Sequence, residues 1–487
     1  MPDTGDAVGE RRTVRGTGVA PRPTRRTAVA LPCAALIVVA WGVLLFGGVY
    51  PWAYWPLLLG CAGVGFAAWV GAPNRKDLQV AHIAFACVLL GIALQLVPLP
   101  RQALAGVSPA THRFLAQTDL GYGAVGSQSG HQLSINPNAT LRGLAFFVTL
   151  GLFVRGLAGG LTTIRIRPLI AGLTVLGTAV GTVGIIQKAL HADHVYGFWH
   201  SQFASEPFGP FVNRNHFAGW IVLLLPLSLS YAWALMTTHG YRRHHSLISR
   251  FLWLTSVEAS QSALAGFACG VMILALGMTL SRSGIVAGTL AIAFLAIGLS
   301  RRSGLLAKMS LGAFAIGLIS MGLLWDGSSG KLSQRFGEFA VSPLGGRLGA
   351  WNDALGVIRQ FPLFGSGLNT YGTAMTLYQH HDLARHYAEA HNDYLQLAAE
   401  GGLLVSVPAA VSLIALAYVG LKQFRAAASD PFGRAIRMGA LAGLLGIALQ
   451  EISDFSLQMP GNAVLGCVLL SLFLRRADTA GYIERRA

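Results

Sequence analysis

The sequence contains few charged residues. Asp, Glu, Lys and Arg make up 11% of its 487 residues, whereas they make up about a quarter of an ordinary soluble protein. Hydrophobic residues make up 53%, the mean hydropathy is +0.54, and apolar runs recur from one end to the other. This composition excludes a soluble enzyme with a single anchor, and it also excludes disordered and fibrous proteins. We therefore expect an all-α polytopic membrane protein.

The sequence also lacks the motifs of disulfide, metal and nucleotide chemistry. Its five cysteines all fall in apolar runs, so neither a disulfide framework nor a cysteine metal site is indicated. Several histidines lie between residues 380 and 391, but their spacing does not place them on one helical face, and no HExxH motif is present. A P-loop and a dinucleotide fingerprint are absent as well. No metal and no cofactor are expected.

Twelve apolar stretches approach the roughly 20 residues that cross a bilayer, which predicts about twelve transmembrane helices. They are residues 28–48, 53–71, 79–98, 142–158, 168–188, 216–236, 257–280, 284–300, 304–325, 396–421, 435–452 and 461–475. Only Ser281-Arg282-Ser283 separates the seventh stretch from the eighth. We divide this run because it is far too long for one crossing.

The net charge of +16 would suggest a nucleic-acid partner for a soluble domain, but here the basic residues lie in short loops between apolar runs. With the N-terminus inside, most of the 36 Lys and Arg residues fall in inner segments. The positive-inside rule therefore predicts that both termini lie in the cytoplasm. No nucleic-acid partner is expected.

The predicted organisation places the larger polar segments on the outer face. In order, the chain comprises a disordered basic tail (1–27), nine spans (28–325), a large outer loop (326–395), three spans (396–475) and an inner tail (476–487). Two further outer loops cover about 99–141 and 189–215, whereas the inner loops are short. We therefore expect the protein to work on its outer face.

The large loop carries a short helical pattern. Trp351, Leu355 and Ile358 recur at helical spacing after Gly345-Gly346, and Phe361-Pro362 ends the pattern. This predicts a short amphipathic helix. The helix either lies on the membrane or over a cavity, or it packs on the protein's own loop.

Arginines at the outer ends of predicted spans are the first candidates for chemistry. Arg282 stands between two spans, where a guanidinium is costly unless it faces a wet cavity or an anion. The alternative is that it reaches the lipid head groups. Asn213, Arg214 and Asn215, followed by His216, supply several donors for a polar ligand at the mouth of another span. The alternative there is a helix cap beside an arginine that reaches the head groups.

A third arginine belongs to the large loop. Gly345-Gly346-Arg347 places a fixed positive charge at a predicted helix start, with Trp351 one turn further on. Because the first N–H groups of a helix also attract anions, this position favours an anion site. The glycines of the segment Phe361–Leu368 permit a close approach to a ligand or to a neighbouring helix.

The entrance to the tenth span supplies the candidate base. His391 can act as a general base near neutral pH, and Asn392 and Asp393 could fix its tautomer. The alternative is that these polar residues cap the following helix. Glu451 and Asp454, near the end of the eleventh span, are the remaining candidate acids.

Three of these motifs follow one another in a characteristic order along the chain. They are Ser281-Arg282-Ser283-Gly284 between two spans, Gly346-Arg347 with Trp351 and the Pro362–Gly367 turn, and His391-Asn392-Asp393-Tyr394-Leu395 with Glu400-Gly401. Together they resemble the O-antigen ligase and O-antigen polymerase superfamily over roughly residues 210–460. The predicted twelve-span layout extends the resemblance along the chain.

The resemblance implies a GT-C-like fold in the bacterial inner membrane. It also implies a metal-independent, inverting glycosyltransferase that takes a glycan from undecaprenyl diphosphate on the periplasmic side. Arg282 and Arg347 match family arginines that hold the diphosphate, and His391 matches the histidine that activates the acceptor hydroxyl. Arg214 lies where relatives often have a basic or polar residue, but the surrounding Asn-Arg-Asn-His block is a variant.

The resemblance leaves the acceptor open. A ligase transfers the glycan to lipid A-core, whereas an O-antigen or exopolysaccharide polymerase transfers it to another lipid-linked glycan. A flippase or transporter of lipid-linked glycans is the alternative class, but it predicts charges near the span centres and related halves. Here the charges lie at the outer ends of the spans. A structural subunit would have no use for Arg282, Arg347 and His391 beyond folding.

Overall fold

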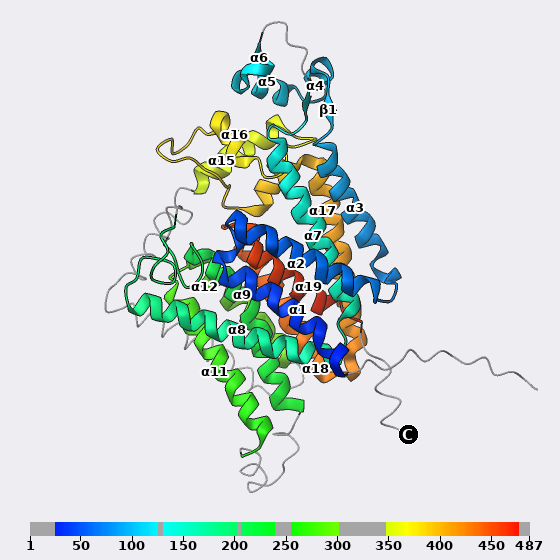
Figure 1. Ribbon diagram of the computed structural model, residues 1–487, viewed down its shortest axis with the longest axis vertical. Helices are drawn as coiled ribbons and strands as arrows, with labels where there is room; N and C mark the ends of the chain where they lie inside the picture. Colours follow the sequence, from blue (N-terminus) through cyan, green and yellow to red (C-terminus); the bar gives the residue numbers. More distant parts are fainter. Residues whose placement is uncertain (1–24, 125–129, 202–205, 239–254, 301–346, 477–487) are drawn as a thin grey trace, which may run out of the picture.

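A computed structural model describes residues 25–124, 130–201, 206–238, 255–300 and 347–476. Long helices form a bundle, and short helices cover one of its ends (Figure 1). The long helices are α1 (Arg25–Leu44), α2 (Pro51–Val70), α3 (Gln79–Leu94), α7 (Pro137–Gly160), α8 (Thr163–Ala189), α9 (Arg214–Thr238), α11 (Val257–Met278), α12 (Arg282–Ser300), α17 (Asp393–Ala426), α18 (Pro431–Gln450) and α19 (Pro460–Leu474).

These helices confirm a mainly helical polytopic membrane protein. Nine helices in the described ranges are long and apolar enough to cross a membrane, and Val29–Leu44 and Pro460–Leu474 are shorter apolar helices. Each overlaps one of the predicted spans, whereas the predicted span 304–325 lies outside the described residues. The predicted break is confirmed because α11 ends at Met278 and α12 begins at Arg282. The number of twelve and the GT-C-like architecture stay predictions.

The bundle is built around α9, whose apolar window is 78% buried. Helix α18 packs along it, and small residues permit the approach. A Cβ atom on Gly443 would lie 2.3 Å from the carbonyl oxygen of Leu223, and one on Gly439 would lie 2.8 Å from that of Pro226. Helices in a bilayer associate through such close backbone contacts because apolar burial between them gains nothing over lipid.

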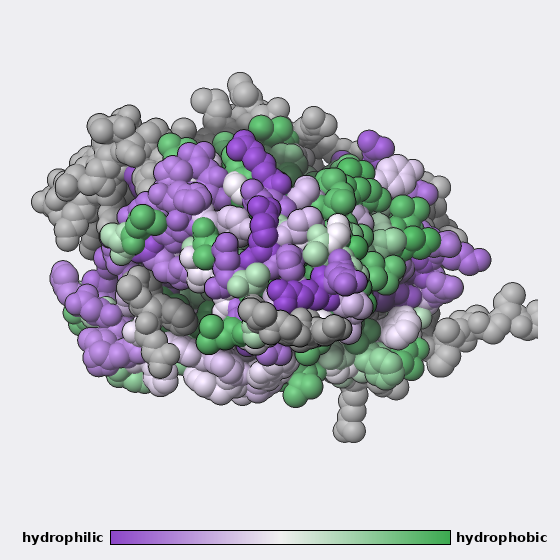
Figure 2. Space-filling view, turned by 90° about the horizontal axis from the view of Figure 1, so that it is seen from above, coloured by the Kyte–Doolittle hydropathy of each residue, from purple (hydrophilic) through white to green (hydrophobic). Residues whose placement is uncertain are grey.

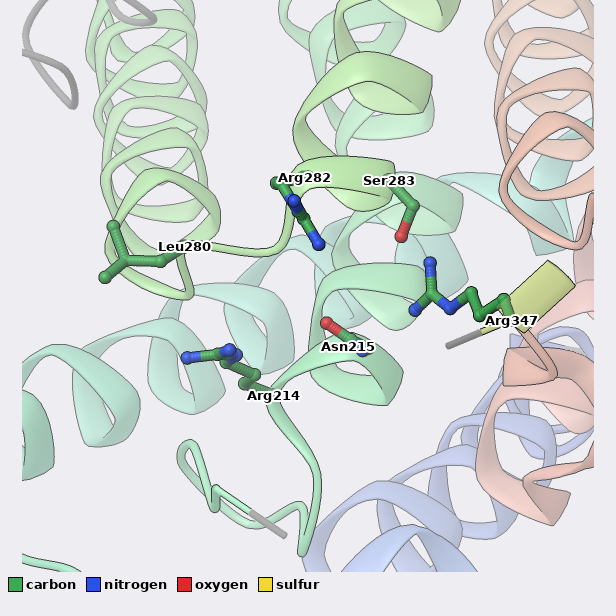
Figure 3. A pocket seen from close by; sticks show the side chains of 6 residues that line it. All are labelled: Arg214, Asn215, Leu280, Arg282, Ser283 and Arg347. Carbon is green, nitrogen blue, oxygen red and sulfur yellow. The ribbon is translucent and has the colours of Figure 1, made fainter. Parts of the chain in front are cut away.

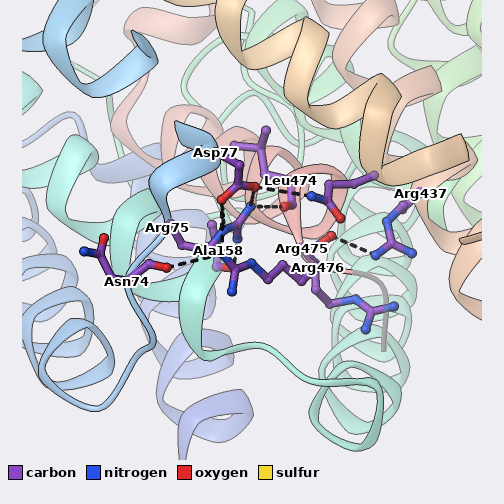
Figure 4. A network of polar contacts seen from close by, with 9 residues as sticks. Asn74, Arg75, Asp77, Ala158, Arg437, Leu474, Arg475 and Arg476 are labelled. Carbon is purple, nitrogen blue, oxygen red and sulfur yellow. Dashed lines mark hydrogen bonds and ion pairs between the residues drawn. The ribbon is translucent and has the colours of Figure 1, made fainter. Parts of the chain in front are cut away.

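Buried arginines close the end of the bundle at which α7 and α19 finish (Figure 4). Arg75 is 2% exposed, and its guanidinium donates to the carbonyl oxygens of Ala158 (2.7 Å) and Leu474 (2.8 Å). Both oxygens belong to last helical turns, whose carbonyls have no partner within the helix. Asp77 accepts two further bonds from Arg75. The cation therefore neutralises a carboxylate and two helix ends at once.

The short helices lie at the opposite end. They are α4 (Arg101–Val107), α5 (Pro109–Thr118), α6 (Leu120–Gly123), α15 (Arg347–Gln360) and α16 (Tyr371–Tyr378). Strand β1 (Pro98–Leu99) pairs antiparallel with β2 (His131–Gln132), with Leu99 opposite His131. Leu104, Phe114 and Tyr371 belong to one hydrophobic cluster that joins the segment 98–135 to α15 and α16. Seen from above, hydrophilic side chains extend across the middle of this end (Figure 2).

Helix α15 occurs where the sequence predicts a helix, and small side chains occupy most of its buried positions. Ala350, Ala354 and Val357 are fully buried, whereas Leu355 is 38% exposed. Trp351 and Ile358 are only half-buried. A hydropathy pattern draws attention to large apolar side chains. Where α15 approaches α17 closely, however, small side chains fit between the two helices. Of the alternatives for this helix, the structure favours packing on the protein's own polypeptide.

Candidate functional site

A polar pocket of about 110 Å³ lies where three helices begin. Its lining residues are Arg214, Asn215, Leu280, Arg282, Ser283 and Arg347. Figure 3 shows the guanidinium groups of Arg282 and Arg347 directed into the space between these helix starts. The structure thus brings all three predicted arginines together from distant parts of the sequence.

Arg214 and Arg282 are the first residues of α9 and α12, and Arg347 is the first described residue of α15. The first N–H groups of a helix have no carbonyl partner within it, and they carry the positive end of the helix dipole. The starts of α9 and α12 and three guanidinium groups therefore surround one pocket with positive charge. An anion with several oxygens, such as a diphosphate, fits such a site.

The turn before α12 fixes Arg282. Leu280 has a φ of 55°, in the left-handed region that few side chains adopt. The hydroxyl of Thr279 accepts a hydrogen bond from the N–H of Ser281 (3.1 Å). A Cβ atom on Gly284 would lie 2.5 Å from the Cβ of Ala218, so α12 begins in close contact with α9. The sequence Ser-Arg-Ser-Gly thus makes a tight turn between two packed helices.

At the start of α9, only one of the two asparagines predicted to bind a ligand lines the pocket. The side chain of Asn213 accepts a hydrogen bond from the N–H of Asn215 (2.8 Å), and Asn213 is not among the residues that line the pocket. Asn215 does line it, and its carbonyl oxygen accepts a bond from Gln450 (3.0 Å). Arg214 forms an ion pair with Glu206. A capping role thus describes Asn213 better than ligand contact does.

The glycines after α15 anchor that helix to α17. Helix α17 is interrupted at Gly402, which has a φ of 56° and a ψ of −165°. A Cβ atom on Gly365 would lie 2.0 Å from the carbonyl oxygen of Glu400. The N–H of Gly367 donates to that same oxygen (3.0 Å), and the N–H of Leu403 donates to Pro362 (2.9 Å). These glycines therefore serve contact with a neighbouring helix rather than with a ligand.

Buried polar side chains complete this anchor. The carboxylate of Glu400 is buried and accepts from the N–H groups of Asn369 (2.8 Å) and Tyr371 (3.0 Å). Gln95 is fully buried and donates to the carbonyl oxygens of Phe364 (2.6 Å) and Glu400 (2.8 Å). Since buried polar groups are costly when unpaired, this network favours a single position for the loop that carries Arg347.

His391 lies immediately before α17, with a φ of 51°. Its ring packs edge-on against Phe455 at 4.9 Å, and the ring of His216 packs against the same phenyl group at 4.7 Å. Burial lowers the pKa of His391 to about 4, and the positive charge of Arg347 acts in the same direction. The imidazole is therefore neutral at pH 7 and able to accept a proton.

Asp454 is the acid that links this group. It is fully buried, and its negative charge opposes the lowering of the pKa of His391. Burial lowers the pKa of Arg347 as well, Asp454 opposes that shift, and the positive charge of Arg282 adds to it. Asp454 thus acts electrostatically on both His391 and Arg347, and Arg347 also feels the charge of Arg282. In the sequence, Asp454 is an acid in an apolar setting, which indicates a functional residue. The sequence does not show which residues it interacts with.

The residues that follow His391 do not hold its ring in the predicted way. Asn392 accepts from the N–H of Leu395 (3.0 Å) and donates to the carbonyl oxygen of Ile452 (2.9 Å), so it caps α17. Asp393 accepts from Gln458 (2.7 Å). The Nδ1 atom of His391 has no partner among the described residues. The prediction that Asn392 and Asp393 fix the tautomer through this nitrogen is therefore wrong.

Two further side chains, those of Trp351 and His381, have surroundings that local spacing did not show. The indole nitrogen of Trp351 is buried and has no hydrogen-bond partner among the described residues. His381, one of the clustered histidines, pairs with the buried carboxylate of Asp353 at 2.7 Å. Within the described part of the chain, no three His, Cys, Asp or Glu side chains are arranged to hold a metal ion.

The matched part of the chain contains most of this site. Residues 267–410 match a family whose description is O-antigen ligase. The match includes Arg282, Arg347 and His391, whereas Arg214 and Asp454 lie outside it. No curated protein matches the chain. This match supports a domain of the O-antigen ligase and O-antigen polymerase superfamily at residues 267–410.

Proposed function

We propose that the protein transfers a glycan from undecaprenyl diphosphate to an acceptor hydroxyl at the periplasmic face of the bacterial inner membrane. The observation that carries this proposal is the convergence of Arg282 and Arg347 on one pocket, beside a histidine that is neutral at pH 7. The lipid bilayer, the lipid-linked donor and a lipid A-core or lipid-linked acceptor are the partners that this reaction needs. Neither a metal nor another cofactor is part of the proposal.

The arginine pocket supports the departure of the diphosphate. As the bond between the sugar C1 atom and the phosphate oxygen breaks, its electron pair goes to that oxygen. Two guanidinium groups can stabilise the growing charge through paired hydrogen bonds, and they are in place before the reaction starts. The starts of α9 and α12 add further positive potential at the same place.

His391 supplies the base. In the proposed step the acceptor oxygen forms a bond to C1, and its proton passes to the imidazole. Attack from the face opposite the leaving diphosphate inverts the configuration at C1, and no covalent enzyme intermediate is needed. Burial, together with the charge of Arg347, keeps the imidazole neutral before the step. Asp454 lies close enough to stabilise the imidazolium that results.

The proposal is tested with purified protein in detergent and an undecaprenyl-diphosphate-linked oligosaccharide, with and without lipid A-core. Transfer only with lipid A-core would identify a ligase, and elongation of the donor alone would identify a polymerase. Folded protein that transfers glycan to neither acceptor would contradict the proposal and favour a flippase or transporter.

Variants connect the activity to the pocket. Arg282→Lys and Arg347→Lys keep the charge but lose the planar fork, so we expect transfer to fall at least about tenfold. His391→Ala should bind donor but not turn it over. Arg359→Lys is the matched control, because Arg359 is exposed at the far end of α15 and should retain full activity. Equal activity of all the variants would refute the assigned roles.

A further inference from the structure

Six aromatic side chains gather beside the arginine pocket, and we call them the aromatic cluster. They are Phe46, Tyr50, Trp52, Tyr196, Phe198 and Trp199. They come from the connection between α1 and α2, from the first turn of α2, which carries Trp52, and from the turn that follows α8. Phe46 is the hub, because its ring contacts those of Tyr50 (5.4 Å), Trp52 (5.9 Å), Tyr196 (5.9 Å) and Trp199 (4.9 Å).

The cluster is held rigidly. The indole N–H of Trp199 donates to the hydroxyl of Tyr50 (3.0 Å), and the hydroxyl of Tyr196 donates to the carbonyl oxygen of Leu44. The backbone of Phe46 has a φ of 59°, and that of Tyr196 has a φ of 57°. Such a backbone is costly for an aromatic residue, and residues of this kind concentrate at functional sites.

The same cluster contacts the segment that leads to Arg214 in the pocket. Val212 packs in it together with Phe46, Tyr50 and Val195. Val212 stands two residues before Arg214, so their Cα atoms are at most about 7.6 Å apart. Gly47 contacts the ring of Phe211, since a Cβ atom there would lie 2.9 Å from it. A ligand whose charged group occupies the pocket therefore has the aromatic cluster within reach.

Part of the cluster is open. Trp52 is 49% exposed and Phe198 is 70% exposed. The rings of Tyr50 and Trp52 lie nearly parallel, with an angle of 6° between their planes, and those of Tyr196 and Phe198 are inclined by 18°. The open rings thus offer broad aromatic surface, which is the kind of surface that stacks on the C–H face of a pyranose ring.

Aromatic residues also anchor helices at a membrane interface. Trp69, at the opposite end of α2, has the features of an anchor: it is 45% exposed and contacts the ring of Phe66. An anchor needs neither a left-handed backbone nor hydrogen bonds between segments. The aromatic cluster has both, and it adjoins a polar pocket.

We propose that the aromatic cluster is a glycan-binding platform that stacks on the sugar rings of the donor beyond the residue attached to the diphosphate. This inference rests on the proposed function, because it assigns the pocket to the diphosphate. Trp52 and Phe198 make the stacking contacts. Phe46, Tyr50, Tyr196 and Trp199 hold them in position.

The experiment compares two donors, undecaprenyl diphosphate with one hexose and the same lipid with several repeats. Trp52→Ala and Phe198→Ala should each raise the KM of the long donor about 2- to 12-fold, which is the range of one aromatic contact. The KM of the short donor should change less than about twofold. Trp52→Tyr should restore most of the affinity. Trp69→Ala is the matched control and should change neither value.

A second measurement separates this inference from the proposed function. Titration of the protein with the free oligosaccharide should quench tryptophan fluorescence in the wild type and in Trp69→Ala, and only weakly in Trp52→Ala. Quenching without any transfer would support the platform and contradict the proposed reaction. Transfer with equal effects of Trp52→Ala on both donors, or with Trp52→Ala and Trp69→Ala behaving alike, would refute the platform and leave the reaction standing.

Discussion

Substitution of Gly365 by Ala tests whether the contact with α17 positions the pocket. The new Cβ atom would lie 2.0 Å from the carbonyl oxygen of Glu400, and ordinary contact begins at 3.4 Å, so the turn must move by about 1.4 Å. The φ of 69° adds about 1 kcal/mol for a residue with a side chain. The movement also weakens the bonds from the N–H groups of Ser366 and Gly367 to α17, at about 0.5–1.5 kcal/mol each.

We therefore expect Gly365→Ala to lower the free energy of unfolding by about 2–4 kcal/mol. Because the displaced turn follows the helix that begins at Arg347, transfer should fall by up to about a hundredfold. Thermal unfolding in detergent and the glycosyl-transfer assay measure the two effects. Gly356→Ala is the control, since a Cβ atom there would contact nothing within 4 Å and Ala favours a helix. Equal stability and activity of the two variants would refute the anchoring argument.

Three further predictions concern the pH dependence, the cap and the metal. His391 must be neutral to accept a proton. A pKa of about 4 therefore predicts that kcat/KM is lost as the pH falls through 4 and is flat from about pH 5.5 to 7.5. A midpoint near 6.5 in the pH profile would contradict this assignment. Asn392→Ala removes the cap of α17 and should lower stability by about 1–2 kcal/mol in thermal unfolding, and an unchanged midpoint would exclude the cap. EDTA should leave the transfer rate unchanged, whereas loss of transfer with recovery on adding a divalent ion would overturn the metal-free reaction.

Several features of this protein follow from local sequence. Apolar runs near the length of a bilayer crossing predicted the helices, because every backbone polar group in lipid must be paired within its own segment. The break at Ser281–Ser283 followed from the excess length of one run, and α11 and α12 confirm it. Arg282 stood out because arginine is costly between two spans, and Arg347 stood out because it lies at a predicted helix start.

Other features depended on which surfaces meet, and tertiary structure alone decided them. The apolar pattern of Trp351, Leu355 and Ile358 left open what α15 packs against, and the contact with α17 buries Ala350 and Ala354. Spacing assigned Asp393 to His391, whereas the negative charge that acts on its ring comes from Asp454, on the connection between α18 and α19. Burial and electrostatic partners depend on contacts between segments, and no local pattern encodes them.

The pocket itself shows the same division. From the sequence alone, three arginines were expected at three helix starts. The sequence did not show that these starts share one pocket, because their convergence requires the close contact of α12 with α9 at Gly284 and the glycine anchor of the α15 loop on α17. The residue types determined what the site can bind, and the packing of the helices determined that it exists.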